Sequence, residues 1–64
     1  MTLCFYVLYN KEEHFFYCDN QWGYTENVLL AEQYSSCDKA KDHLRFFKVP
    51  QEWEIKKVIV QVDI

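Results

Sequence analysis

The segment that decides the fold is Leu3-Cys4-Phe5-Tyr6-Val7-Leu8-Tyr9, in which every side chain is apolar or aromatic. β-Branched and aromatic residues favour strands, and a strand without polar alternation is typical of one that is covered on both faces. We therefore expect residues 3–9 to form a central strand of a sheet.

The residues that follow predict two more strands. Asn10-Lys11-Glu12-Glu13 is a polar turn, and residues 14–18, His14-Phe15-Phe16-Tyr17-Cys18, fit a second strand that pairs back as a hairpin. The only glycine, Gly23, lies in the next break and can take a positive φ there. Residues 28–31 fit either a short strand or a helical turn, and we favour a short edge strand over residues 31–34.

A helix of about three turns is expected next. Ser35 or Ser36 is the candidate N-cap, and Ser35 with Asp38 forms a weak capping box. Pro50 ends the helix, because the residue before a proline is disfavoured in the α region. One apolar stripe is formed by Cys37, Ala40, Leu44 and Phe47, and the side chains expected to face solvent are Lys39, Lys41, Asp42 and Arg45.

The last segment has the clearest period-two pattern of the chain, with Val58, Val60, Val62 and Ile64 at alternate positions. Ile55 has the opposite parity, so a bulge near Lys56-Lys57 is expected if Ile55 and Val58 both face the core. The whole chain, residues 1–64, is predicted to be one α+β domain. Its architecture would be a small antiparallel or mixed sheet of about four strands with one helix packed on a face, in the order β-β-β-α-β.

Length and composition limit the class of protein. A chain of 64 residues buries only about 60 % of the surface that its unfolded chain exposes, so disulfides, a metal or a partner subunit would supplement its stability. The three cysteines, Cys4, Cys18 and Cys37, cannot all pair within one chain, which favours a reducing compartment. We find no export signal and no apolar run of the roughly 20 residues that a bilayer requires, so we expect a cytoplasmic protein without membrane contact.

The sequence predicts neither a metal site nor a catalytic site. The cysteines together with His14 and His43 are zinc-ligand types, and Cys4, His14 and Cys18 could meet across a hairpin, but their spacing matches no zinc motif. Packing is the favoured role, and any further role of the cysteines is left open.

Cys37 and His43 are six residues apart on the helix, too far for a nucleophile and its base. Adjacent carboxylates such as Glu12 and Glu13 are not an acid–base pair around a substrate, and one glycine cannot build a phosphate loop. We therefore predict a non-enzyme without a cofactor.

Charge is divided unevenly along the chain. Residues 1–36 carry a net charge of -4 and residues 37–64 a net charge of +1. An acidic, aromatic-rich half is repelled by nucleic acid and attracted to basic protein surfaces, although a merely solvated acidic face is the competing interpretation. The alternative function is a small nucleic-acid-binding regulator that uses the basic helix and last strand, with the group Lys39, Lys41, Arg45, Lys48, Lys56 and Lys57.

Two segments carry a family resemblance. Trp22-Gly23-Tyr24-Thr25, followed by Ala31, Tyr34, Ser35-Ser36 and a helix with Ala40, resembles a pattern of small bacteriophage and prophage accessory proteins. Residues 49–55, Val49-Pro50-Gln51-Glu52-Trp53-Glu54-Ile55, followed by a valine-rich strand, are similar to the end of the RNA polymerase inhibitors of short-tailed coliphages. The first 35 residues follow a different pattern, so the binding residues of those inhibitors are not transferred.

The resemblance implies an inhibitor of host takeover or anti-defence type, which would act inside the bacterial host cell by occupying a surface of a protein machine. Such a machine would be a CRISPR effector, another defence complex or RNA polymerase. Twelve of the 64 residues are aromatic, more than a core of this size must hold, so we expect exposed rings at a protein interface. The predicted partner-binding anchors are Tyr6, Tyr17, Trp22, Tyr24 and Trp53, and the residues expected to steer approach are Glu12, Glu13, Asp19 and Glu26.

Two other interpretations remain beside partner binding. Each aromatic residue could instead pack in the core. For Trp22 and Trp53 we consider core packing and partner binding equally supported, and for Tyr6 we favour core packing. The terminal strand, residues 58–64, could also pair edge to edge with that of a second copy, which would give a homodimer.

Overall fold

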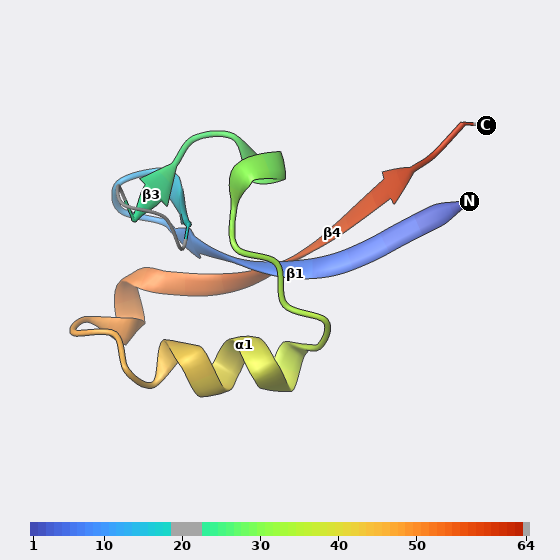
Figure 1. Cartoon of the computed structure of the whole chain (residues 1–64). Helices are drawn as coiled ribbons and strands as arrows, with labels where there is room; N and C mark the ends of the chain where they lie inside the picture. The colour runs from blue at the N-terminus through green and yellow to red at the C-terminus, as the bar shows by residue number, and fades with distance from the viewer. Residues whose placement is uncertain (19–22, 64) are drawn as a thin grey trace.

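The fold is a four-stranded antiparallel sheet with helical segments on both of its faces (Figure 1). The computed structural model describes residues 1–18 and 23–63. The strands are β1 (Thr2–Asn10), β2 (Phe15–Tyr17), β3 (Tyr24–Thr25) and β4 (Trp53–Gln61), and their order in the sheet is β3-β2-β1-β4. The predicted α+β class, the single helix and the central place of the first strand are thus confirmed.

The two faces of the sheet are covered by different segments. The helix α1 (Cys37–Leu44) lies across one face, and the short 3-10 helix η1 (Val28–Leu30) lies on the other, as Figure 1 shows. A second 3-10 helix, η2 (Pro50–Glu52), leads directly into β4. We call the two sides of the sheet the α1 face and the η1 face.

The third strand lies earlier in the chain than the expected edge strand over residues 31–34. It is β3, at Tyr24–Thr25, and Val28–Leu30 form the helical turn that was the alternative prediction. Of the expected strand, Tyr34 forms an isolated bridge with Tyr6 through two backbone hydrogen bonds of 2.9 Å, and the backbone N–H of Glu32 donates to the carbonyl of Tyr17 at 3.0 Å. This apolar run forms η1 instead of extending the sheet; Leu29 and Leu30 are exposed in it, and Ala31 directly after η1 is buried.

The expected bulge near Lys56-Lys57 is absent, because β1 and β4 pair without interruption from Thr2↔Gln61 to Asn10↔Trp53. Ile55 and Val58 therefore lie on opposite faces of the sheet, and both are half-buried. A bulge was expected only if Ile55 and Val58 both faced one core on the same side of the sheet. Helical segments lie on both faces and both residues are half-buried, so no break in the pairing is required to bring them to one side.

The helix begins as the sequence predicts. Ser36, not Ser35, is the N-cap, and its hydroxyl oxygen accepts a hydrogen bond of 3.2 Å from the backbone N–H of Lys39. Ala40 is fully buried at the centre of the apolar stripe, and Leu44 is half-buried. The expected length of about three turns, with the end at Pro50, is wrong: α1 has eight residues and ends at Leu44, so Phe47 of the same stripe lies beyond it, in the turn that leads to η2.

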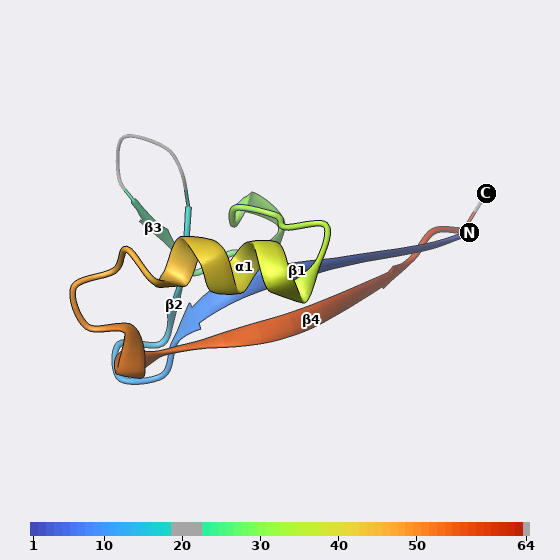
Figure 2. The same cartoon turned by 90° about the horizontal axis from the view of Figure 1, so that it is seen from below.

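The buried centre of the molecule is small and lies in the middle of β1. Val7 and Leu8, neighbours whose side chains point to opposite faces, are both fully buried. Beyond them, residues 2–5 of β1 and 58–61 of β4 continue as a two-stranded ribbon that projects from the body and ends at the adjacent chain termini (Figure 2). We call this ribbon the apolar arm, because Leu3 and Ile59 are exposed on it.

The position of Leu8 predicts a large effect on stability. Leu8→Ala should lower the free energy of unfolding by about 2–5 kcal/mol, because it opens a cavity in place of one of the largest fully buried side chains of the described residues. Leu29→Ala, at an exposed position on η1, is the matched control and should change it by less than about 0.5 kcal/mol. Urea unfolding followed by circular dichroism measures both. Equal effects of the two substitutions would place the core elsewhere.

Candidate functional site

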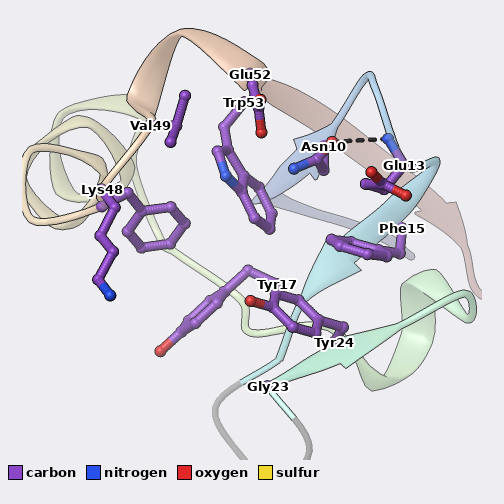
Figure 3. A pocket seen from close by; sticks show the side chains of 11 residues that line it. Asn10, Glu13, Phe15, Tyr17, Gly23, Tyr24, Lys48, Val49, Glu52 and Trp53 are labelled. Carbon is purple, nitrogen blue, oxygen red and sulfur yellow. Dashed lines mark hydrogen bonds between the residues drawn. The ribbon is translucent and has the colours of Figure 1, made fainter.

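Four of the predicted partner-binding residues come together around one hollow on the α1 face of the sheet. Tyr17, Tyr24, Trp53 and Glu13 all line it, and Figure 3 shows the three rings turned toward a common space. Phe15 and Phe47 complete the set of rings. We call the hollow formed by the rings of Phe15, Tyr17, Tyr24, Phe47 and Trp53 the aromatic basin; its volume is about 630 Å³.

Strand alternation explains why one wall of the basin forms. Phe15 and Tyr17 are two residues apart on β2 and so point to the same face, and Tyr24 is the cross-strand neighbour of Tyr17. Phe15 and Tyr24 stack with their ring centroids 4.4 Å apart and their planes 27° apart. This pair forms a continuous aromatic surface on the β2–β3 side of the basin.

Trp53 forms the wall opposite this pair. Its ring lies 6.3 Å from that of Tyr24, at an interplanar angle of 24°, and 5.8 Å from that of Phe15. It enters the basin as the first residue of β4, directly after η2. Trp53 is thus both a packing residue and part of an accessible surface, because it is only half-buried.

The segment after α1 supplies the remaining wall. Phe47 meets Trp53 edge to face with centroids 5.0 Å apart, and it lies 5.1 Å from the ring of Tyr17. Behind Phe47, His43 packs edge-on against Tyr17 and shares a hydrogen bond through its Nδ1 atom with the hydroxyl of Tyr34. The rings of α1 and β2 therefore hold one another, which fixes the shape of the basin.

Sequence reasoning missed two of the five rings for different reasons. Phe47 was assigned only to the apolar stripe of the helix, whereas its place after the helix end turns it toward Trp53. Phe15 shares its parity with Tyr17, so the alternation of residues 14–18 contained a signal that would have found it. Glu52 was also missed as a site residue, because its position at the basin depends on η2.

Two turns bring carboxylates to the basin. Asn10 is almost completely buried, and its Oδ1 atom accepts hydrogen bonds from the backbone N–H groups of Glu12 (3.0 Å) and Glu13 (2.8 Å). The backbone N–H of Lys11 donates to the carbonyl of Glu52 at 3.0 Å, which ties this turn to η2. The segments that carry Glu13 and Glu52 are thus held together by backbone geometry.

The two carboxylates at the basin are not neutralised by a direct partner within the described residues. The ion pairs there are Arg45 with Asp42 at 3.3 Å and Lys56 with Glu54 at 2.9 Å, and neither includes Glu13 or Glu52. Lys48 also lines the basin, at its periphery in Figure 3. The basin therefore combines aromatic faces with a net negative rim.

The other predicted anchors lie elsewhere or outside the described residues. Tyr6 is half-buried in β1, where it pairs with Tyr34, and it does not line the basin. Glu12 and Glu26 are exposed, and neither lines it. The predictions for Asp19 and Trp22 fall on residues outside the part of the chain that the structure describes.

A second hollow, of about 410 Å³, lies at the apolar arm. It is lined by side chains of β1, β4 and the segment from η1 to α1, namely Leu3, Cys4, Phe5, Leu29, Gln33, Ser35 and Val60. Ile59 on the same arm is 62 % exposed. The arm thus leaves apolar surface open at the end of the molecule that carries the termini (Figure 2).

The predicted zinc-ligand types do not converge within the described residues, where no group of three or more His, Cys, Asp or Glu side chains could hold a metal ion. The three cysteines have free thiols, and Cys4 lies exposed on the arm while Cys18 is buried after β2.

Along residues 1–18 and 23–63, no helix is long and apolar enough to cross a bilayer.

The chain matches no known family model, no curated protein and no solved structure. The function of the basin is therefore argued from its own residues. Those residues are aromatic rings and carboxylates from β2, β3, the turn between β1 and β2, the segment after α1, η2 and the first residue of β4.

The buried Asn10 predicts a link between turn geometry and the basin. Asn10→Ala should lower the free energy of unfolding by about 1–3 kcal/mol, because two partly buried N–H groups lose their acceptor. It should also shift the tryptophan emission. Trp53 is the cross-strand neighbour of Asn10, so it lies beside the turn that loses these hydrogen bonds. Asn27→Ala removes a similar hydrogen bond, to the N–H of Leu29, at an exposed position. This control should cost less and leave the emission unchanged; the reverse order would contradict the role of Asn10.

Proposed function

We propose that this chain is a non-catalytic protein-binding module and that the aromatic basin is its docking face. The observation that carries the proposal is the gathering of five rings on one face with none of them fully buried; Tyr24 is 54 % exposed. Tyrosine and tryptophan are enriched at interface hot spots, where a large flat ring buries much area at low entropic cost.

The proposed partner is a protein of a bacterial host. The resemblance of residues 22–40 to phage accessory proteins supports an inhibitor that covers a surface of a defence complex, such as a CRISPR effector, or of RNA polymerase. The net charge of -3 and the carboxylates beside the basin favour a basic partner surface. In this proposal the protein acts in the host cytoplasm and needs no cofactor.

A nucleic-acid-binding regulator is the alternative. The exposed side of α1 carries Lys39, Lys41 and Arg45, which would supply phosphate contacts. However, Arg45 is paired with Asp42, and Lys56 is paired with Glu54. This pairing lowers the positive charge available to a phosphate backbone, so protein binding ranks first.

Self-association is a second, compatible proposal. β4 is an edge strand of nine residues, and its outer edge has no strand partner within the described residues. Such an edge is a template for pairing with a second copy, and the exposed Ile59 would become buried there. A homodimer through the C-terminal half of β4 would cover the part of the arm that the small core leaves open.

Partner binding predicts a selective loss. With the host protein captured by tagged chain from nuclease-treated bacterial lysate, Tyr24→Ala should raise the Kd at least about fivefold, corresponding to the loss of roughly 1 kcal/mol or more of binding free energy. Leu30→Ala is the control, because Leu30 is similarly exposed but lies on η1. Capture that disappears with nuclease, or equal losses for both variants, would contradict docking at the basin.

The dimer proposal predicts that Ile59→Lys gives a monomer, because like charges would face one another across the paired edges. Gln61→Lys adds the same charge at a position that is already polar and near the strand end, so it should reduce dimerisation less. Light scattering after size-exclusion chromatography measures the mass. A wild-type chain that is monomeric at about 100 μM would rule the proposal out at concentrations where typical specific dimers form.

A further inference from the structure

We infer that the aromatic basin is a receptor for a cationic side chain, the ammonium of lysine or the guanidinium of arginine, presented by the partner. This inference rests on the proposed function in taking the ligand to be part of a protein. The chemistry of recognition, however, follows from the basin itself and can be tested without any partner.

The ring geometry suits a cation. The faces of Tyr24 and Trp53 are nearly parallel, 24° apart, with centroids separated by 6.3 Å, and Phe15 lies 4.4 Å from Tyr24 and 5.8 Å from Trp53 (Figure 3). A cation held within about 6 Å of an aromatic centroid is attracted by the negative face of the ring. A group at the mouth of the basin can meet more than one of these rings.

Charge distinguishes a cation from an apolar occupant. Glu13 and Glu52 line the same hollow, and neither belongs to an ion pair of the described residues. An apolar anchor that filled the basin would cover these carboxylates and remove water from them without providing a partner, which is costly. A cation supplies that partner, so the rings and the carboxylates favour the same occupant.

Lys48, the basic residue in the lining of the basin, is not the cation that pairs with Glu13 or Glu52 within the described residues. Lys48 is exposed, makes no ion pair in the described part of the chain, and lies at the periphery in Figure 3. With Glu13 and Glu52 the lining carries a formal charge of -1. The basin thus keeps its attraction for a positive group.

The opposite face of the sheet holds an intramolecular example of the same arrangement. The Nζ atom of Lys56 lies 5.5 Å from the centroid of the Tyr9 ring and 2.9 Å from Oε1 of Glu54. One ring and one carboxylate are sufficient there to hold a lysine at the surface. The basin presents several rings beside two carboxylates, and the ion pairs and the lysine–ring contact of the described residues involve neither Glu13 nor Glu52.

Choline and its uncharged carbon analogue 3,3-dimethylbutan-1-ol form a matched pair of probes, because they have nearly the same shape and differ in charge. Binding is followed by the indole N–H resonance of Trp53 in a Trp22→Phe chain, which leaves Trp53 as the only tryptophan. We expect choline to bind with a Kd at least about fivefold below that of the neutral analogue. Equal affinities, or no shift with either probe, would overturn the inference.

Substitutions at Glu13 and Glu52 test the role of the carboxylates. Glu13→Gln combined with Glu52→Gln should weaken choline binding and leave the neutral analogue unaffected. Glu12→Gln is the control, because Glu12 lies in the same turn, carries the same charge and does not line the basin. A loss of choline binding as large in Glu12→Gln would mean that long-range charge, not the basin, attracts the probe, and would overturn the assignment.

The inference and the proposed function can fail separately. A captured host protein whose binding is weakened by Tyr24→Ala but not by the double glutamine variant would support the docking face and overturn the cationic ligand. Selective choline binding that is lost in the double variant, in a chain that captures no protein, would support the cation site and overturn the proposed function.

Discussion

The structure depends on the burial of Val7 and Leu8, two adjacent residues of β1 that point to opposite faces of the sheet. A strand with this pattern must be covered twice, and a chain of 64 residues has few segments with which to do so. The backbone pairing of Tyr6 with Tyr34 solves the problem, because the chain crosses the free edge of β1 there. η1 lies before the crossing and α1 after it, so one passage covers both faces (Figure 1).

Because so few segments cover the sheet, both ends of the long β1–β4 pair keep accessible apolar and aromatic surface. At one end, Leu3 and Ile59 of the apolar arm are exposed. At the other end, the rings of the aromatic basin contact one another and line a hollow. A small domain buries a limited share of its apolar surface in any arrangement. Here the unburied share is concentrated in two places instead of being scattered, and such concentration is typical of surfaces that meet a partner.

Local patterns in the sequence predicted the elements that local physics determines. The stripe through Ala40, the serine cap and the alternation of the last strand each depend on residues within a few positions of one another. β3 escaped prediction because two residues cannot display a period, and the apolar run before Tyr34 forms a 3-10 helix although its composition suits a strand. The basin was predicted only in part, through Tyr17, Tyr24, Trp53 and Glu13. Its remaining members depend on long-range contacts, such as the bond from Lys11 to Glu52, that no local pattern encodes.

The separation of the two open surfaces bears on how they would act together. Trp53 and Ile59 stand six positions apart on the same extended strand, which places them about 20 Å from one another at the rise of a β-strand. A second copy paired to the C-terminal half of β4 would therefore leave each basin accessible. Such a dimer would present two basins on one rigid sheet, so a partner with repeated basic segments would bind it more tightly than a single basin could, without any new type of contact.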